Sequence, residues 1–319
     1  MKAAILQAPR KFTIEDIDLP VLNDDEVLVR TKACGICSSE LPQWKGTASG
    51  VEYPRLIGHE PSGVVEAVGR EVTDYSAGDR VTAWSGGGGF AEYFKSIAKY
   101  LHPLKEETPF HEALGEPLAC AVNGMLKASP EKGESVAIVG TGYMGLLMIQ
   151  AFRAQGCDPV IAIDTREEML SVALEHGAHF AINPQHNDLN KTLNKLLSNA
   201  KVDIGVEAAG LQETLDLTAG LVRMEGKLEI FGFHQGTPRS VDLGYWNWMA
   251  FDIINGHSRS DYKYMDGLRT AIELLENGDL NCSRLITHKF SLNDINAAFT
   301  EAEKKNPEFI KAVIDFESA

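Results

Sequence analysis

Donor side chains suited to a metal ion are grouped in the N-terminal part of the sequence. They are Cys34 and Cys37 in ACGICSSE, His59 and Glu60 in IGHEPSG, and Glu116 in GEPLACAVNG. Thiolate, imidazole and carboxylate ligands together suit a catalytic zinc ion, which keeps one position open. A C-x-x-C pair without a second pair is poor evidence for a structural zinc. The sequence therefore predicts a catalytic metal site.

Each of these donors also has an interpretation without a metal. C-G-I-C resembles a thioredoxin-like dithiol, but such a motif normally opens a helix in a βαβ pattern, whereas this one lies in a β-rich region. A single histidine is more often a hydrogen-bonded structural residue, and glutamates are usually exposed acids. The residues that flank the donors are needed to decide between these interpretations.

A second group of residues forms a glycine motif, G-x-G-x-x-G, between the apolar run VAIV and the apolar stretch YMGLLMIQAF. Glycine allows a tight turn, close approach of the backbone to a pyrophosphate, and close helix–sheet packing. The start of the following helix attracts phosphate. The predicted dinucleotide-binding residues of this turn are Gly140, Gly142, Tyr143, Met144 and Gly145.

An acid at the end of the next strand supports this interpretation. Asp164 follows the run VIAI, about 20 residues after the glycine motif, where a carboxylate can accept hydrogen bonds from an adenosine ribose. A glycine turn that only packs a helix would explain the glycines but not this acid. Its charge would repel a 2′-phosphate, which favours NAD over NADP. Arg166 stands two residues away and acts against this preference.

The elements around the glycine motif alternate in type. Short β-branched runs, separated by helix-like stretches, are typical of βαβ units on a parallel, Rossmann-type doubly wound sheet. These runs are 136–139, 160–163, 180–183, 204–207 and 228–231. Before residue 121 the short strands are separated by too few residues for crossover helices, which predicts mostly antiparallel β structure.

Three segments follow from this difference in pattern. They are a catalytic zinc-binding β domain at 1–121, a dinucleotide-binding domain at 122–260, and a C-terminal segment at 261–319 whose last strand returns to the first domain. A chain of 319 residues exceeds the size at which one core usually stops growing, so two domains are expected.

Composition narrows the class of partner and the compartment. A formal charge of −15 makes binding to nucleic acid or to an anionic membrane unfavourable, so we expect a small-molecule partner. No apolar run has the length of a signal-peptide core or a membrane span. Five cysteines in so large a chain speak against a disulfide framework. We therefore expect a cytoplasmic protein.

Six motifs in order resemble the medium-chain zinc alcohol dehydrogenase family from the first strand to the last. They are G-I-C-x-S, G-H-E-x-x-G-x-V-x-x-V-G, G-D-R-V, E-P-L-A, G-x-G-x-x-G and L-I-T-H. The resemblance implies an α/β protein with a GroES-like catalytic domain beside a Rossmann domain. It also implies zinc and NAD as cofactors and a homo-oligomer, either a dimer or a tetramer.

The resemblance gives roles to the metal-site residues. Cys37, rather than Cys34, corresponds to the thiolate ligand, His59 to the imidazole ligand, and Glu116 to the third-ligand position. Glu60 is a further metal and catalytic candidate, because it can replace or compete with bound water.

The same resemblance gives roles to two residues beside the ligands. Ser39 corresponds to the hydroxyl that receives the substrate proton, and Glu40 to the acid that orients His59. This chain has Glu40 where the family usually has Asp, and Pro42 where many members have a proton-relaying His. Cys120, four residues after Glu116, is an alternative ligand if that segment is helical.

A further departure concerns the number of zinc ions. The four-cysteine structural zinc lobe of the family should follow G-D-R-V, but this chain continues TAWSGGGGFAEYF. Only one zinc ion per chain is therefore expected.

The resemblance implies hydride transfer between NAD and a secondary alcohol. A carboxylate-rich metal site with GHE and EPL resembles the polyol and sugar-alcohol branch. Candidate substrate residues are Trp44, Tyr53, His257 and Arg259. An aromatic residue is more often part of a core, whereas an arginine can hold a carboxylate, a phosphate or vicinal hydroxyls.

Two other functions stay open at this point. A zinc-free quinone or enone reductase of the same superfamily would lack the metal ligands. A noncatalytic dinucleotide sensor would keep the glycines and need no zinc site.

Overall fold

The apolar runs in the middle of the sequence form one parallel sheet. The computed structural model describes residues 1–84, 86–197, 201–236 and 238–317, and in these residues the strand order is β11-β10-β9-β12-β13-β14. The strands are β9 (Val136–Val139), β10 (Val160–Ile163), β11 (Phe180–Ile182), β12 (Val202–Glu207), β13 (Val222–Ile230) and β14 (Asp252–Asn255). This order is that of a doubly wound dinucleotide-binding fold, so the predicted fold class is confirmed.

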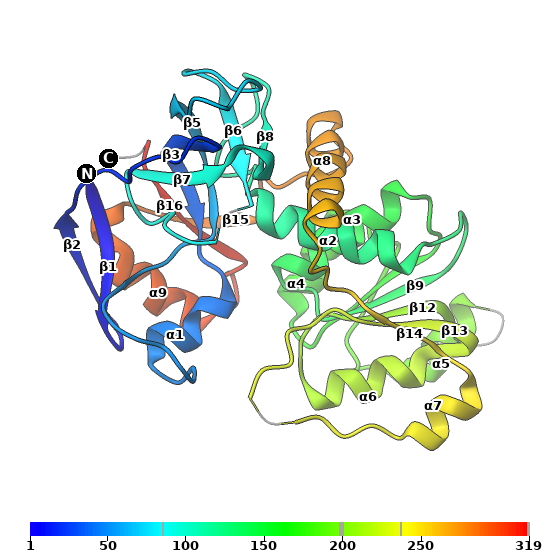
Figure 1. Ribbon diagram of the computed structural model, residues 1–319. Coiled ribbons are helices and arrows are strands. Elements are labelled where there is room, and N and C mark those ends of the chain that lie inside the picture. Colours follow the sequence, from blue (N-terminus) through cyan, green and yellow to red (C-terminus); the bar gives the residue numbers. More distant parts are fainter. Residues whose placement is uncertain (85, 198–200, 237, 318–319) are drawn as a thin grey trace. The chain divides into compact units, whose positions relative to one another are not determined.

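Helices cover both faces of this sheet, with α3 on one side and α6 on the other (Figure 1). Strands covered on both faces bury every side chain, which explains why β9 and β10 are continuous apolar runs. The helices of this region are α3 (Tyr143–Ala154), α4 (Glu167–Glu175), α5 (Leu189–Leu196), α6 (Gln212–Leu221) and α7 (Leu243–Met249).

The N-terminal part and two strands from the C-terminal end of the chain form a second, largely antiparallel sheet with the order β15-β16-β3-β5-β6-β8, and β7 also pairs with β3. Its strands are β3 (Glu26–Gly35), β5 (Glu60–Val68), β6 (Arg80–Ala83), β7 (Tyr93–Ile97), β8 (Leu101–Pro103), β15 (Ile286–Phe290) and β16 (Lys311–Asp315). β16 pairs with β3, so the last strand of the chain lies in the N-terminal sheet. The antiparallel prediction for residues 1–121 is confirmed.

A three-stranded sheet of β1 (Lys2–Ala8), β2 (Lys11–Asp16) and β4 (Arg55–Leu56) adjoins a separate core. Phe12, Trp44, Phe90 and Phe299 form the centre of this core. The short helical segments from the N-terminal part are η1 (Ser38–Glu40), α1 (Leu41–Lys45) and η2 (Ala98–Tyr100), and those from the C-terminal end of the chain are η3 (Leu292–Asp294) and α9 (Ile295–Lys304).

The chain divides into two units. Unit 1 comprises Met1–Ala119, Leu268–Glu276 and Cys282–Ala319, and unit 2 comprises Cys120–Gly267 and Asn277–Asn281. The chain passes between the units inside α2 (Gly115–Ala128) and α8 (Asp261–Asn277). The sequence analysis expected domain boundaries near residues 121 and 260, and the chain changes unit at residues 120 and 268. None of the helices in the described ranges is long and apolar enough to cross a bilayer.

Strand β13 of unit 2 carries a buried acid that no motif predicted. Glu229 is 0% exposed, and both of its carboxyl oxygens lack a hydrogen-bond partner among the described residues. Gly124 and Gly256 leave the space for it, because a Cβ at either position would lie within 2.8 Å of Oε1. Burial raises the pKa of Glu229 to about 8, against an opposing effect of Lys127.

We expect Glu229 to make the protein less stable as the pH rises. The pKa of Glu229 is higher in the folded state than the ordinary value of 4.5. The stability that the protonated carboxyl contributes to the folded state is therefore fully present below pH 4.5 and is lost by about pH 8. Glu229→Gln, which stays neutral, should therefore have a melting temperature that falls less between pH 5 and about pH 8 than that of the wild type. Equal pH profiles of the melting temperature would contradict this expectation.

Candidate metal and dinucleotide sites

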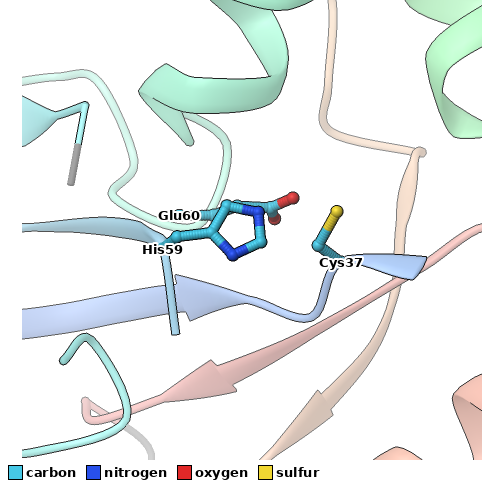
Figure 2. A group of neighbouring side chains, drawn as sticks. All are labelled: Cys37, His59 and Glu60. Atoms are coloured by element: carbon cyan, nitrogen blue, oxygen red, sulfur yellow. The ribbon is translucent and has the colours of Figure 1, made fainter. Parts of the chain in front are cut away.

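The metal-site donors lie together in unit 1, where strand β3 ends beside the start of its neighbour β5. Gly35, the last residue of β3, pairs with Glu60, the first residue of β5. Cys37 follows β3 and His59 precedes β5, so the three donor side chains lie together. The ligand atoms of Cys37, His59 and Glu60 all lie within 4.8 Å of one another. Figure 2 shows the sulfur, the imidazole ring and the carboxylate turned toward one another.

Gly35 gives the Glu60 carboxylate its place. A Cβ at Gly35 would lie 1.9 Å from Glu60 Oε2 and 2.8 Å from Leu114 Cδ1. Any larger residue would therefore displace the carboxylate from the surface of β3. The C-G-I-C motif thus contains a glycine that the metal site requires for a steric reason.

Glu40 holds both ligand segments from behind. Its Oε1 accepts a hydrogen bond from the backbone N–H of Gly58 (2.9 Å) and lies 3.0 Å from His59 Nδ1, and its Oε2 accepts from the backbone N–H of Cys37 (3.2 Å). A histidine that donates from Nδ1 keeps the lone pair of Nε2 for a metal. Glu40 is 1% exposed, and its side chain reaches His59 although the family usually has the shorter Asp.

The electrostatics of this cluster favour a bound cation. Burial lowers the pKa of His59, but Glu40 and Cys37 outweigh it and raise the pKa to about 12. Burial and the Glu60 carboxylate raise the pKa of the Cys37 thiol. The cluster therefore retains protons when no metal is bound. A divalent cation would supply the positive charge in their place, so the donor set fits zinc.

Lys311 belongs to the same cluster and was missed by the sequence analysis. It lies on β16, is 5% exposed, and places Nζ 2.5 Å from Glu60 Oε2. Burial lowers the pKa of Lys311, but Glu60, Cys37 and Glu116 raise it by more. The sequence signal that could have revealed it is the lysine at the start of the apolar strand KAVID. A lysine is almost never fully buried unless it is paired, so a buried lysine there indicates an acidic partner.

The other predicted metal-site residues lie around this group. Glu116 is half-buried in the first turn of α2 and is not one of the three clustered donors, although its charge acts on Lys311. Cys120 Sγ lies 2.8 Å from the hydroxyl of Tyr264, within unit 2. Ser39 Oγ donates to Cys37 Sγ at 3.2 Å, which places the predicted proton acceptor beside the thiolate ligand.

The glycine motif forms the turn between β9 and α3. Gly140 has φ +98°, and a Cβ at Gly145 would lie 2.0 Å from the Gly140 carbonyl oxygen, so neither position accepts another residue without strain. Gly142 is the N-cap of α3, and a Cβ there would meet nothing within 4 Å. This open space at a helix N-terminus fits a pyrophosphate. Tyr143 and Met144 begin the helix.

Asp164 ends β10 as predicted, but its carboxylate is already engaged. Oδ2 accepts from the backbone N–H of Thr141 (2.8 Å), and the Arg166 guanidinium donates to both oxygens at 3.0 and 3.1 Å. Burial raises the pKa of Asp164, but hydrogen bonding and charge from Arg166 outweigh it and lower the pKa. The carboxylate is therefore ionised and its charge is largely balanced by Arg166.

The four predicted substrate residues lie in different environments. Trp44 is 2% exposed in the core of unit 1, where Phe299 packs against its ring, so its position is explained by packing. The hydroxyl of Tyr53 donates to the Gln43 carbonyl oxygen at 2.6 Å. His257 stacks on Phe231, and Arg259 is exposed, both in unit 2. The structure thus does not bring these four residues together within one unit.

Two family models match separate parts of the chain and together cover more than half of it. The model for the alcohol dehydrogenase GroES-like domain matches residues 23–106, and the model for zinc-binding dehydrogenase matches residues 144–260. The chain belongs to the zinc-type alcohol dehydrogenase family. It is therefore an oxidoreductase with zinc and a dinucleotide as cofactors, as the sequence predicted.

The chain matches related dehydrogenases over nearly their full length. It is 27% identical to a sorbitol dehydrogenase of Bacillus subtilis, and the match covers 98% of this chain and 97% of the relative. It is 26% identical to a D-arabitol-phosphate dehydrogenase of Enterococcus avium, with coverages of 99% and 97%. Among solved structures, an alcohol dehydrogenase from Escherichia coli CFT073 in complex with NADH superposes with a TM-score of 0.89 at 25% identity, covering 99% of each chain.

We expect about one zinc ion per chain, because one donor cluster is present among the described residues and the sequence lacks the structural zinc lobe. Elemental analysis of protein purified without chelator should give this stoichiometry. Cys37→Ser should lose most of the zinc, whereas Cys157→Ser, at a buried cysteine of unit 2, should retain it. Two zinc ions per chain, or none after zinc supplementation, would contradict the assignment.

Proposed function

We propose that the chain is an NAD-linked polyol dehydrogenase, which transfers a hydride between NAD and a secondary hydroxyl of a polyol, a sugar or a related hydroxy compound. The observation that carries the proposal is the cluster of Cys37, His59 and Glu60, in which a carboxylate stands beside one thiolate and one imidazole. An oxygen ligand leaves zinc a stronger Lewis acid than a second thiolate would, which suits a hydroxyl-rich substrate that can chelate. The sorbitol and arabitol-phosphate specificities of the relatives agree with this class.

Cys37, His59 and Glu60 would hold the zinc, with Glu116 as the further ligand position. Bound zinc supplies a Lewis acid that lowers the pKa of a coordinated hydroxyl. Ser39 would take up the hydroxyl proton while it passes its own proton to water or another acceptor, since its Oγ lies at the thiolate ligand. Glu40 keeps His59 in the tautomer that offers Nε2. Lys311 draws the Glu60 carboxylate toward β16 and so sets how readily Glu60 serves as a ligand.

The dinucleotide would bind at the turn Gly140–Gly145, with its pyrophosphate at the start of α3 and its adenosine ribose at Asp164. The bound dinucleotide would supply a nicotinamide ring as donor or acceptor of a hydride.

A substrate panel tests the proposal. Zinc-loaded protein with NAD is offered polyols, phosphorylated polyols, free sugars and simple secondary alcohols, and NADH formation is followed by absorbance. We expect the highest kcat/KM among the polyols or their phosphates. Preference for a simple alcohol, or no NADH from any of these compounds, would overturn the polyol assignment.

Cofactor preference gives a separate prediction. We expect NAD to exceed NADP in kcat/KM, because the Asp164 carboxylate occupies the position where a 2′-phosphate would lie. Asp164→Gly should narrow this difference, since it releases the Arg166 guanidinium to pair with the 2′-phosphate. The matched variant Asp164→Gly/Arg166→Met should lose the NADP gain. A wild-type enzyme that prefers NADP would show that Arg166 governs this position.

The proposal includes a homo-oligomeric, cytoplasmic enzyme, as the sequence analysis expected. Light scattering coupled to size exclusion tests the oligomeric state, and a monomer at micromolar concentration would overturn that part alone.

A further inference from the structure

A buried group of polar residues lies at the carboxyl edge of the sheet in unit 2. Glu207, the last residue of β12, is 0% exposed. Its Oε1 accepts hydrogen bonds from the backbone N–H groups of Ala209 (2.9 Å) and Gly210 (2.7 Å), and from the Thr214 hydroxyl (2.6 Å). This oxygen therefore holds the loop 208–210 and the first turn of α6.

The other carboxylate oxygen faces the loop that follows β13. Glu207 Oε2 lies 2.8 Å from His234 Nε2. A Cβ at Gly232 would lie 2.4 Å from Oε2 and 2.3 Å from the Gly210 nitrogen, so the two loops meet only because this residue is glycine. The carboxylate of Glu207 thus joins the loops that follow two adjacent strands.

Arg239 contacts both loops. Its Nε donates to His234 Nδ1 at 3.1 Å, and its Nη2 donates to the Gly210 carbonyl oxygen at 2.8 Å. We call Glu207, His234 and Arg239 the Glu207 cluster.

The arrangement of donors fixes the proton on His234. A guanidinium only donates, so Nδ1 must accept and the proton of neutral His234 must be on Nε2. Nε2 lies 2.8 Å from Glu207 Oε2, and both atoms are buried without a well-aligned hydrogen bond to any described group, so the protonated nitrogen and the carboxylate oxygen are in close polar contact. Arg239 therefore donates to His234, and the protonated nitrogen of His234 lies beside the Glu207 carboxylate.

The loop that Glu207 holds packs against the dinucleotide turn. A Cβ at Gly140 would lie 2.9 Å from Ala209 Cβ and 3.0 Å from the Ala209 nitrogen. The Ala208 N–H donates to the Val139 carbonyl oxygen at 2.9 Å, directly before Gly140. Any shift of loop 208–210 would therefore displace the first glycine of the turn.

We propose that the Glu207 cluster consists of positioning residues for the dinucleotide, which hold the loops 208–210 and 232–236 in the form that binds it. The proposal rests on the assignment of the dinucleotide to the turn Gly140–Gly145. The cluster acts on dinucleotide affinity and not on the chemistry at the zinc site, because its contacts lie within unit 2.

The test measures NADH dissociation constants of the zinc-loaded protein by fluorescence titration, with kcat, KM for NAD and melting temperature measured in parallel. Glu207→Gln keeps the shape but places an amide N–H against the N–H of His234, which should weaken NADH binding about tenfold. KM for NAD should rise by a similar factor while kcat changes little. Glu229→Gln, the same replacement in the next strand at a carboxyl without a partner among the described residues, is the control and should leave NADH binding unchanged.

A double variant separates positioning from general damage to the fold. Removing the donor in Arg239→Met lets His234 carry its proton on Nδ1, so that Nε2 can accept from the amide introduced by Glu207→Gln. Glu207→Gln/Arg239→Met should therefore bind NADH no more weakly than Arg239→Met alone.

Each other outcome has a distinct meaning. Additive losses in the double variant, or an unchanged NADH dissociation constant in Glu207→Gln, would overturn the proposal. Failure of the wild-type protein to bind NADH would overturn the dinucleotide assignment on which it rests.

Discussion

Lys311→Met should destabilise the metal-free protein and enlarge the stabilisation that zinc provides. The variant leaves the Glu60 carboxylate buried without the ammonium that lies 2.5 Å away in the wild type. Breaking a buried ion pair in this way costs about 3–5 kcal/mol. Zinc would then replace the missing positive charge, so the rise in melting temperature on adding zinc should be larger in the variant than in the wild type.

Calorimetry of both proteins with and without zinc measures this effect. Lys289→Met is the matched control, because Lys289 is exposed on the neighbouring strand β15 and its loss should change stability by no more than about 0.5 kcal/mol. A Lys311→Met protein with wild-type stability and a wild-type response to zinc would show that the ion pair does not restrain Glu60.

Glu116→Ala should lose most turnover and retain zinc less well, whereas Cys120→Ser should leave both largely intact. Glu116 lies in the first turn of α2, and its charge acts on Lys311 and thereby on the metal cluster. The Cys120 thiol instead contacts the Tyr264 hydroxyl. We expect a loss of kcat of about 10- to 100-fold in Glu116→Ala, the range typical of residues that support a metal site.

Steady-state kinetics and zinc analysis of the two variants decide between the residues. If the serine variant loses zinc while the alanine variant still turns over, Cys120 is a ligand. The polyol inference that depends on an oxygen-rich site would then fail.

The sequence was sufficient for features that depend on local pattern. The strands at 136–139 and 160–163 were predicted to the residue, because strands covered on both faces must be apolar throughout. β13 begins at Val222, earlier than the predicted run at 228, because its first six residues, VRMEGK, include three charged side chains, among them Glu225 with φ +55°. Cys37, His59 and Glu60 were found from their ligand types and from the motifs G-I-C-x-S and G-H-E-x-x-G around them, and in the structure they lie where β3 and β5 pair.

The return of the last strand to the first domain was predicted, but the side-chain contacts that this and other distant pairings create were not. Lys311 is far from Glu60 in the sequence, and its role follows only from the place of β16 beside β3. The Glu207 cluster likewise depends on the meeting of two loops at Gly232. Trp44 resembled a substrate residue by type, but the core around Phe299 accounts for it, and nothing local distinguishes the two cases.

We propose that one zinc ion binds to Cys37 as its single sulfur ligand, together with His59 and carboxylate oxygen. X-ray absorption at the zinc edge of the wild-type protein tests this claim most directly. We expect one sulfur at about 2.3 Å, with the remaining ligands nitrogen or oxygen at about 2.0–2.2 Å. Two or more sulfur ligands, or none, would contradict it.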